Sequence, residues 1–207
     1  MKTSLVLLSL FGTLLCSGLA ARSAETVDLI ATDGFDMNSK WMIKDGVLSN
    51  SKTPGGILWS KKAYGDFTVT LDYKTSAKCN SGLFFRSNPK NAVQGGFEIQ
   101  IASHGLYSGK HVVGSLYDAQ VPSKAMGKPD GEWNTMVLTC KGPNFKVVLN
   151  GETVNEVNID QWTTPNKNPD GSKNKFKTAL KDLPRTGHIG LQYHGKPISF
   201  RNIRVTE

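Results

Sequence analysis

Residues 67–73 read FTVTLDY, and this stretch shows most clearly what kind of fold the chain adopts. Large apolar side chains occupy every second position, and threonine or aspartate occupies the positions between them. Because successive side chains of a β-strand point to opposite faces of the sheet, this alternation predicts a strand with one face in a core and the other in water. The pattern recurs over 145–150 and 189–194.

Further short runs follow along the chain, separated by turn residues. LNGE at 149–152 contains an Asn-Gly pair, which favours a tight hairpin. Apolar residues at helical spacing are nowhere sustained, and 176–183 allows one or two helical turns at most. We therefore predict an all-β, antiparallel sandwich or barrel with little helix. The expected strands are 27–31, 47–50, 56–60, 67–73, 82–87, 96–102, 112–117, 133–140, 144–149, 153–159, 189–194 and 198–205.

The N-terminus has the composition of a secretory signal peptide. Lys2 precedes an apolar run over 5–15, and small residues follow it, so cleavage after Ala20 or after Ser23 would both fit. The run is too short for a comfortable membrane span, and no later stretch is long and apolar enough for one. We expect a signal peptide over 1–23, a single domain over 24–207, and a secreted or periplasmic protein without a membrane span.

Cysteines and charge narrow the classes of partner. Export would leave Cys79 and Cys140, and the sequence permits either a disulfide or two separate buried thiols. The net charge of +8 comes from scattered lysines, with no basic stripe interleaved with aromatic residues, which argues against a nucleic-acid partner. The polar, turn-rich segment 161–186 is unusually long for a loop, and loops of this length are often functional.

Three expected strands carry large polar side chains on one face. By parity, Glu98 and Gln100 share a face in GFEIQI, Gln192 and His194 share one in GLQYHG, and Arg86 lies opposite the apolar face of GLFFRS. If these strands belong to one curved sheet, the polar groups could line a concave surface. Carboxylates, amides and guanidinium groups hydrogen-bond sugar hydroxyls, so this surface suits a carbohydrate.

Aromatic side chains could cover the apolar face of a sugar, and the candidates are Tyr117 and Trp133. Structural roles are open beside these functional ones. Glu98 and Arg86 could form an ion pair, His194 could be a satisfied polar residue, and Trp133 could belong to the core.

Other catalytic signatures are missing from the sequence. It contains no Gly-rich phosphate loop, no G-x-S-x-G elbow, no paired CxxC and no histidine spacing typical of zinc. Glu98 is followed by Gln100 and Ala102, so the second carboxylate of an ordinary double-displacement glycosidase is absent from that strand.

The ordered set of these motifs resembles the 3-keto-disaccharide hydrolase domain family, whose members are secreted proteins with a concanavalin-like lectin/glucanase jelly roll. The resemblance runs from Trp41 to Val205. Its landmarks are DGVL (45–48), YGDFTVTLDYK (64–74), NSGLFFR (80–86), GFEIQI (96–101), GSLYD (114–118), GEWNTM (131–136), VLNGETV (148–154), GHIGLQYHG (187–195) and ISFRNIRV (198–205).

The resemblance implies cleavage of glycosides whose sugar carries a ketone at C3. That ketone acidifies the proton at C2, so one base can start a β-elimination that releases the aglycone, and hydration then makes the outcome a hydrolysis. One carboxylate is enough for this route. We expect Glu98 to be the base or a metal ligand, with His194 as alternative base or as acid.

The remaining candidates would bind the substrate. Arg86 and Gln192 would hold the enolate oxygen and sugar hydroxyls, and Gln100 and Asn80 would orient the sugar. A divalent metal, calcium or a transition metal, could also bind, although the sequence contains no recognisable set of metal ligands.

One position departs from the family pattern. Ser103 stands where many relatives have an aspartate after the E-x-Q-I motif, and this puts catalysis in question more than fold. Two alternatives to the keto-glycoside enzyme therefore stay open. The first is a non-catalytic carbohydrate-binding module using the concave sheet, and the second is an endo-glycanase of the laminarinase type.

Overall fold

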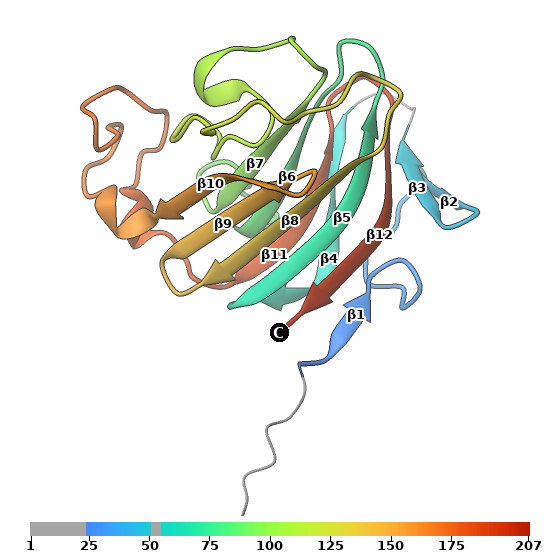
Figure 1. The fold of residues 1–207 in the computed structure, drawn as a ribbon. Helices are drawn as coiled ribbons and strands as arrows, with labels where there is room; N and C mark the ends of the chain where they lie inside the picture. The colour runs from blue at the N-terminus through green and yellow to red at the C-terminus, as the bar shows by residue number, and fades with distance from the viewer. Residues whose placement is uncertain (1–23, 51–54) are drawn as a thin grey trace, which may run out of the picture.

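The computed structural model describes residues 24–50 and 55–207, which form two antiparallel β-sheets packed face to face (Figure 1). The expected signal peptide at 1–23 lies outside the described residues. The β-sandwich predicted from the alternating runs is confirmed, and the barrel is not.

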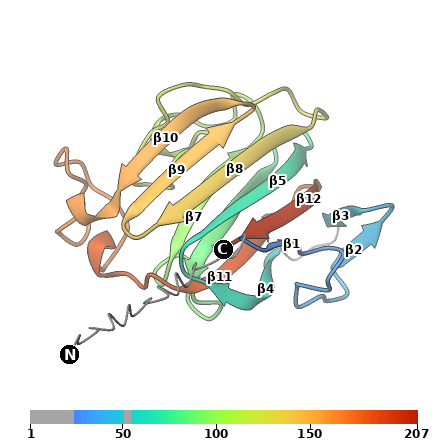
Figure 2. The same cartoon turned by 60° about the horizontal axis from the view of Figure 1, so that its bottom comes forward.

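The larger sheet contains eight strands and extends across one layer of the molecule (Figure 2). Its order is β10-β9-β8-β5-β12-β3-β2, and β1 pairs with β12 beside this path. The strands are β10 (Glu152–Asn158), β9 (Asn144–Leu149), β8 (Asn134–Lys141), β5 (Phe67–Thr75), β12 (Ile198–Thr206), β3 (Val47–Asn50), β2 (Trp41–Lys44) and β1 (Thr26–Asp28).

The smaller sheet has the order β4-β11-β6-β7. Its strands are β4 (Gly56–Tyr64), β11 (Gly187–Tyr193), β6 (Asn80–Ser87) and β7 (Phe97–Ala102). Short 3-10 turns, η1 (Gly109–His111), η2 (Ile159–Gln161) and η3 (Leu180–Asp182), lie in the connecting loops.

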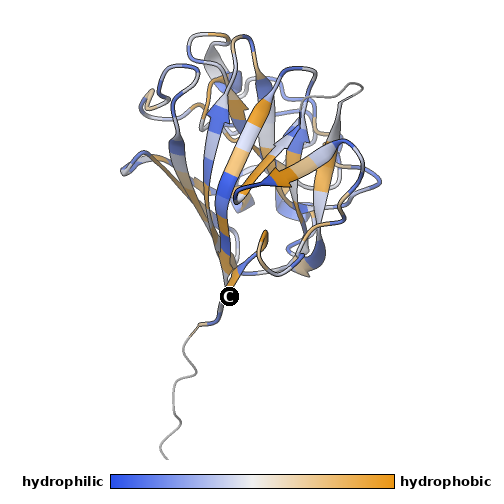
Figure 3. Ribbon diagram, turned by 90° about the vertical axis from the view of Figure 1, so that its right-hand side faces the viewer, coloured by the Kyte–Doolittle hydropathy of each residue, from blue (hydrophilic) through white to orange (hydrophobic). Residues whose placement is uncertain are grey.

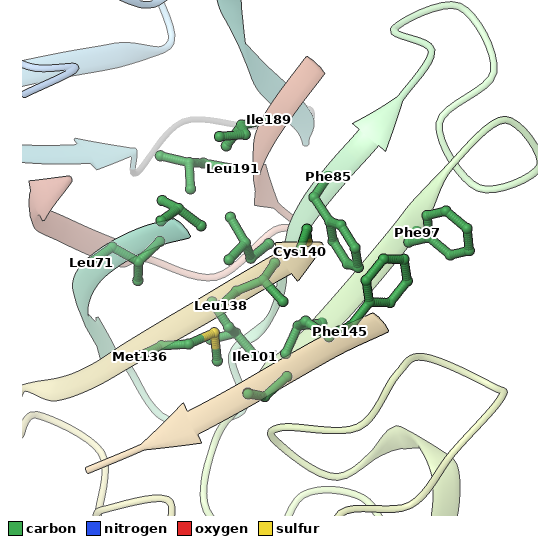
Figure 4. Close-up of a cluster of buried hydrophobic side chains, with 14 of the residues drawn as sticks. Leu71, Phe85, Phe97, Ile101, Met136, Leu138, Cys140, Phe145, Ile189 and Leu191 are labelled. Carbon is green, nitrogen blue, oxygen red and sulfur yellow. The ribbon is translucent and has the colours of Figure 1, made fainter. Parts of the chain in front are cut away.

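The core fills the space between the two sheets. Along the strands, hydrophobic and hydrophilic residues alternate, as the colour bands of Figure 3 show. Inward-facing side chains from both layers meet in Figure 4, where the rings of Phe85, Phe97 and Phe145 cluster with centroids 4.9–5.4 Å apart. Burial of these alternating apolar residues is what holds the sheets together.

The structure contains one strand that the sequence did not predict, and it lacks one that the sequence did predict. Strand β2 was not predicted, because WMIK does not alternate; it forms since Asp45 and Gly46, both with positive φ, close a tight turn to β3. The segment 112–117 is not a regular strand: Leu116 alone bridges β7 at Ile99, and Gly114 turns the chain just before it.

The segment 176–183, for which the sequence allowed one or two helical turns at most, agrees with that expectation. Only the single turn η3 forms there. Within the described ranges, no helix has the length and hydropathy that a bilayer crossing requires.

Cys79 and Cys140 are separate buried thiols, so the disulfide interpretation is wrong. Cys140 pairs with Phe67 at the start of β5, whereas Cys79 follows the end of that strand. A nine-residue strand rising about 3.3 Å per residue therefore separates them.

Candidate functional site

Glu98 lies in a row of side chains that crosses the outer face of the smaller sheet. The register pairs Trp59 with Gly190, Gly190 with Phe84, and Phe84 with Glu98. Directly paired residues of antiparallel strands project from the same face, so all of these positions share one side of the sheet. Their chain neighbours, including Leu58, face the core.

The row continues past the edge strand β7 onto the loop segment 114–117. Tyr117 N–H donates to the carbonyl of Glu98 at 2.9 Å, and Leu116 bridges Ile99. Leu116 is buried in the core, so Tyr117 projects from the outer face directly opposite Glu98. The structure therefore brings together Glu98 and Tyr117, which the sequence predicted as site residues without relating them to each other.

Glu98 has the most perturbed carboxyl group of the site. Its side chain is nearly covered, with 7% of its surface exposed. Burial raises the pKa of this carboxyl to about 8, and the positive charge of Lys175 partly opposes the shift. A glutamic acid with this pKa exchanges its proton near neutral pH, which is the property that a general acid or base requires.

Gly82 provides the space in which the Glu98 carboxyl lies. A Cβ atom added to Gly82 would overlap Glu98 Oε1, so the carboxyl rests directly on the glycine backbone. In the same row as Gly82 stand Gln100, its pairing partner on β7, and, by extension of the β11–β6 register, Gln192. The carboxyl is thus flanked by two strands that carry amide side chains.

Polar side chains border Glu98 beyond the outer edge of β7. Lys175, from the long loop 161–186, donates through Nζ to Tyr117 Oη at 2.6 Å, and its ammonium lies 4.1 Å from the centre of the Tyr117 ring. His111 packs against the same ring and approaches Asp118, with 3.4 Å between Nε2 and Oδ1. Sequence reasoning missed Lys175, because no local pattern relates that loop to β7.

An apolar surface borders Glu98 on the other side. The rings of Trp59 and Phe84 meet edge to face, 5.9 Å between centroids. Trp59 covers Gly190, where an added Cβ would lie 2.5 Å from the indole Cζ3. Trp59 remains partly exposed, so its ring can pack against the apolar part of a ligand. The alternation in GILWS could have predicted that Trp59 faces outward, but the sequence does not show which strand lies beside it.

Gln100 and Asn80 form a hydrogen-bonded pair beneath this surface. Gln100 is almost fully buried, and its Nε2 donates to Asn80 Oδ1 at 2.8 Å and to the carbonyls of Ser81 and Ile101. Asn80 stays partly exposed. Gln100 thus holds Asn80 in place, and Asn80 is the member of the pair that can reach a ligand.

Gln192 lies near the end of β11, in the row of Gly82, and His194 follows the last residue of that strand. Together with Ile57 they line a pocket of about 510 Å³ at the end of the strand, a size typical of small-ligand sites. From the strand spacing and rise, Glu98 and His194 are separated by roughly 16 Å between Cα atoms. They are therefore not in contact as an acid–base pair.

Arg86 does not share the face of Glu98, contrary to the parity expectation. Its backbone has φ 46°, which breaks the alternation, and its side chain is fully buried. The guanidinium donates to the carbonyls of Gly65 and Gly142 and to Asp66 Oδ1 at 2.7–2.9 Å. It also lies 5.4 Å from the ring of Phe145, a core residue, so Arg86 ties loops of the two sheets together.

Trp133 lies on the outer face of the larger sheet. Its ring is covered by the cations of Lys74 and Arg201, at 4.8 and 4.1 Å from the ring centre. The expectation that it lines one surface with Glu98 is therefore wrong. The parity of a residue before a strand shows its local direction but not the sheet to which that strand belongs.

Ser103 faces away from the carboxyl of Glu98. Its hydroxyl donates to the carbonyl of Ser76 and accepts from the N–H of Cys79, so it fastens the end of β7 to the turn before β6. Across the described residues, no group of three His, Cys, Asp or Glu side chains is arranged as metal ligands.

Comparison with known proteins shows that this chain is similar to carbohydrate-active proteins. Residues 28–206 match the model of the 3-keto-alpha-glucoside-1,2-lyase-like domain family. A 3-keto-disaccharide hydrolase from Bacteroides thetaiotaomicron is 29% identical, over 81% of this chain and 70% of the relative.

Solved structures agree with this match. A crystal structure from Parabacteroides distasonis, of a protein provisionally designated a glycosyl hydrolase, superposes with a TM-score of 0.83 at 33% identity, over 87% of this chain and 98% of that one. A second protein of the same organism and designation has a TM-score of 0.69 at 20% identity, over 84% and 88% of the two chains, which shows the fold alone.

Proposed function

The chain belongs to the 3-keto-alpha-glucoside-1,2-lyase-like domain family, and on that premise we propose that it is a carbohydrate-active enzyme that cleaves 3-keto-glycosides. The observation that carries this proposal is the carboxyl of Glu98, which lies nearly buried on the outer face of the smaller sheet with its pKa raised to about 8. An ordinary glycosidase needs two carboxyl groups about the scissile bond, whereas elimination from a 3-keto sugar needs one base.

Glu98 acts first as the base. Its carboxylate removes the proton from C2 of the sugar, and the electrons of that C–H bond form an enolate with the negative charge on the C3 oxygen. A carboxylate whose pKa lies near 8 is a stronger base than an exposed one, which favours this transfer.

Glu98 then acts as the acid. When the enolate collapses, the C3 carbonyl re-forms, a C1–C2 double bond forms, and the bond from C1 to the aglycone oxygen breaks. The proton held by Glu98 passes to the leaving oxygen. Addition of water across the double bond gives the products of hydrolysis, so no oxidant or reductant is consumed.

The rest of the face binds and orients the glycoside. Trp59 offers an apolar surface beside the reacting sugar, and Asn80, held by Gln100, offers an amide for a hydroxyl. Gln192 and His194 would contact the part of the substrate that extends towards the pocket at the end of β11.

A 3-keto-disaccharide and its parent disaccharide test the proposal together. We expect sugar release from the keto form alone, with kcat/KM rising as pH increases through about 8, because Glu98 must be ionised to accept the C2 proton. Glu98→Gln should lower kcat by about 10²–10⁴-fold. Glu132→Gln, at an exposed position outside the site, is the matched control.

Other outcomes would replace the proposal. Full turnover by Glu98→Gln would remove Glu98 as the base, and equal cleavage of the parent sugar would favour a conventional glycanase. Saturable binding of the keto-disaccharide without turnover would make the protein a carbohydrate-binding module.

We further propose that the protein is exported, because its first 23 residues read as a signal peptide. The mature chain should then begin at Ala21 or Ala24. N-terminal sequencing of the protein purified from the cell envelope or medium checks this, and an intact Met1 in that fraction would contradict it.

A further inference from the structure

We propose that Tyr117 and Lys175 form the second half of the catalytic site, in which the Tyr117 hydroxyl donates a hydrogen bond to the enolate oxygen and Lys175 holds that hydroxyl in place. The inference rests on the proposed function and deepens it. It gives the long loop 161–186, which carries Lys175, a role in the reaction.

The placement of Tyr117 follows from the sheet. Because Tyr117 stands directly opposite Glu98 on the same face, their Cβ atoms are about 5 Å apart. The C2 proton that Glu98 would remove and the C3 oxygen that becomes negative belong to neighbouring atoms of the sugar. Glu98 as base and the Tyr117 hydroxyl as donor, on adjacent positions of one sheet face, can therefore reach C2 and the C3 oxygen together.

The hydrogen bond between Lys175 and Tyr117 has a defined direction. An ammonium group can only donate, so the Tyr117 oxygen is the acceptor at 2.6 Å. The proton of the Tyr117 hydroxyl is therefore left to donate to another group. The adjacent positive charge polarises that O–H bond, which strengthens a hydrogen bond to an oxyanion.

Lys175 is anchored by its backbone as well as by its side chain. Its N–H donates to Asp118 Oδ2 at 2.7 Å, and its carbonyl accepts from Gln94 Nε2 at 3.0 Å. The loop is therefore fastened to the segments before and beside β7. This anchoring keeps the ammonium group at Tyr117 without requiring substrate to order it.

The titratable groups that surround Tyr117 come from three elements. Glu98 belongs to β7, His111 and Asp118 flank Tyr117 on its own segment, and Lys175 comes from the long loop. Tyr117 keeps its proton throughout, because it only donates a hydrogen bond to the enolate oxygen, and that bond weakens when the C3 carbonyl re-forms. The proton taken from C2 still leaves on the aglycone oxygen, so the balance of the reaction is unchanged.

Three variants test the inference. Tyr117→Phe keeps the ring and removes the hydroxyl, Lys175→Met removes the charge, and Lys177→Met is the control, since its side chain is exposed two residues further on. We measure turnover of a 3-keto-disaccharide, and exchange of the C2 hydrogen for deuterium in D2O, which reports enolate formation before the aglycone leaves. Thermal unfolding shows that each variant is folded.

We expect Tyr117→Phe to lower both rates by about 10²–10³-fold, as loss of an oxyanion donor does, while Lys177→Met keeps the wild-type rates. Lys175→Met should lower them too and move the midpoint of the pH–rate profile upwards, because its charge favours the ionised form of Glu98. A residue that only supported the fold would not shift this midpoint. Lys175→Arg, which keeps the charge, should recover part of the rate.

The results separate this inference from the proposed function. An active wild type whose Tyr117→Phe and Lys175→Met variants stay within about threefold of it, with an unmoved pH midpoint, overturns the inference and leaves the function standing. A wild type that neither exchanges C2 hydrogen nor releases sugar from the keto substrate overturns both.

Discussion

At the scale of single residues, the chemistry of Glu98 depends on what its neighbours lack. Gly82 has no side chain, so the carboxyl can lie flat on the sheet, where burial keeps water away and raises its pKa to about 8. The same glutamate on an exposed strand would be an ordinary surface carboxylate. The glycine of NSGLFFR is thus part of the site although it carries no reactive group.

Gly82→Ala should therefore impair catalysis more than its small size suggests. The new Cβ would overlap Glu98 Oε1, so the carboxyl must move, and we expect kcat/KM to fall at least tenfold with a loss of about 1–3 kcal/mol of stability. Gly65→Ala is the control, because its Cβ would only approach Thr186 Oγ1 at 3.3 Å. Unchanged kinetics for Gly82→Ala would show that the carboxyl does not act from this position.

Arg86 shows the opposite case, a reactive-looking residue with a structural role. Arg86→Met should lower the free energy of unfolding by about 2–4 kcal/mol, because two loop carbonyls and Asp66 lose a buried charged donor. Urea unfolding measures this. The folded fraction should keep its kcat/KM, and a large rise in KM at unchanged stability would instead assign Arg86 to the substrate.

At the scale of elements, the site is built where regular strands give way to loops. β6 and β7 position Gly82 and Glu98 by their register, but the polar flank comes from the irregular segment 114–118 and from the loop 161–186. The expected strand 112–117 is not regular, yet its bridge at Leu116 still orients Tyr117. Loop segments from two parts of the chain meet at this edge and contribute Tyr117 and Lys175. A single additional strand would present only its own alternate residues.

Gln94, in the segment before β7, fastens the loop 161–186, so its removal should loosen the site without unfolding the protein. Its Oε1 accepts from Lys177 N–H at 2.9 Å, and its Nε2 donates to the carbonyl of Lys175. Gln94→Ala should change stability by about 1–2 kcal/mol for the two hydrogen bonds, lower kcat severalfold and speed tryptic cleavage at the loop lysines.

Limited proteolysis and steady-state kinetics measure these effects, with Gln161→Ala at an exposed position as the control. If Gln94→Ala matches the wild type in both assays, the loop is held by its other contacts.

At the scale of the whole molecule, two sheets with a shared apolar core leave two outer faces with different chemistry. The smaller sheet carries Glu98 and Trp59, while the larger one carries Trp133 between Lys74 and Arg201. Stability comes from the core between them, and no disulfide among the described residues supplements it. The fold can therefore vary the side chains of one face while the core that supports it stays the same.

The state of the cysteines follows from this architecture. A thiol reagent should detect no reactive cysteine in the folded mature chain and two after denaturation, and a reductant should leave the melting temperature unchanged. Burial raises the pKa of Cys79 to about 12, and that of Cys140 also lies above its usual range, so neither forms the reactive thiolate. A melting temperature that falls in reductant would indicate a disulfide.

Alternation along the chain was enough to predict the class of fold and the strand face on which Glu98 lies. Alternation is a local property, since each strand must present every second residue to the core, so FTVTLDY and GFEIQI could be interpreted without knowing their partners. For the same reason, parity failed at Arg86, where a positive φ interrupts the strand, and it could not assign Trp133 to a sheet.

Which side chains meet, and what environment they share, depends on how distant segments pack together. Lys175 is 77 positions from Glu98 in the chain, and its charge reaches the carboxyl only because the loop 161–186 folds back beside β7. Trp59 likewise joins the row through the register of β4 with β11. A pKa depends on burial and on charges within a few ångströms, and both quantities exist only once distant segments have packed together.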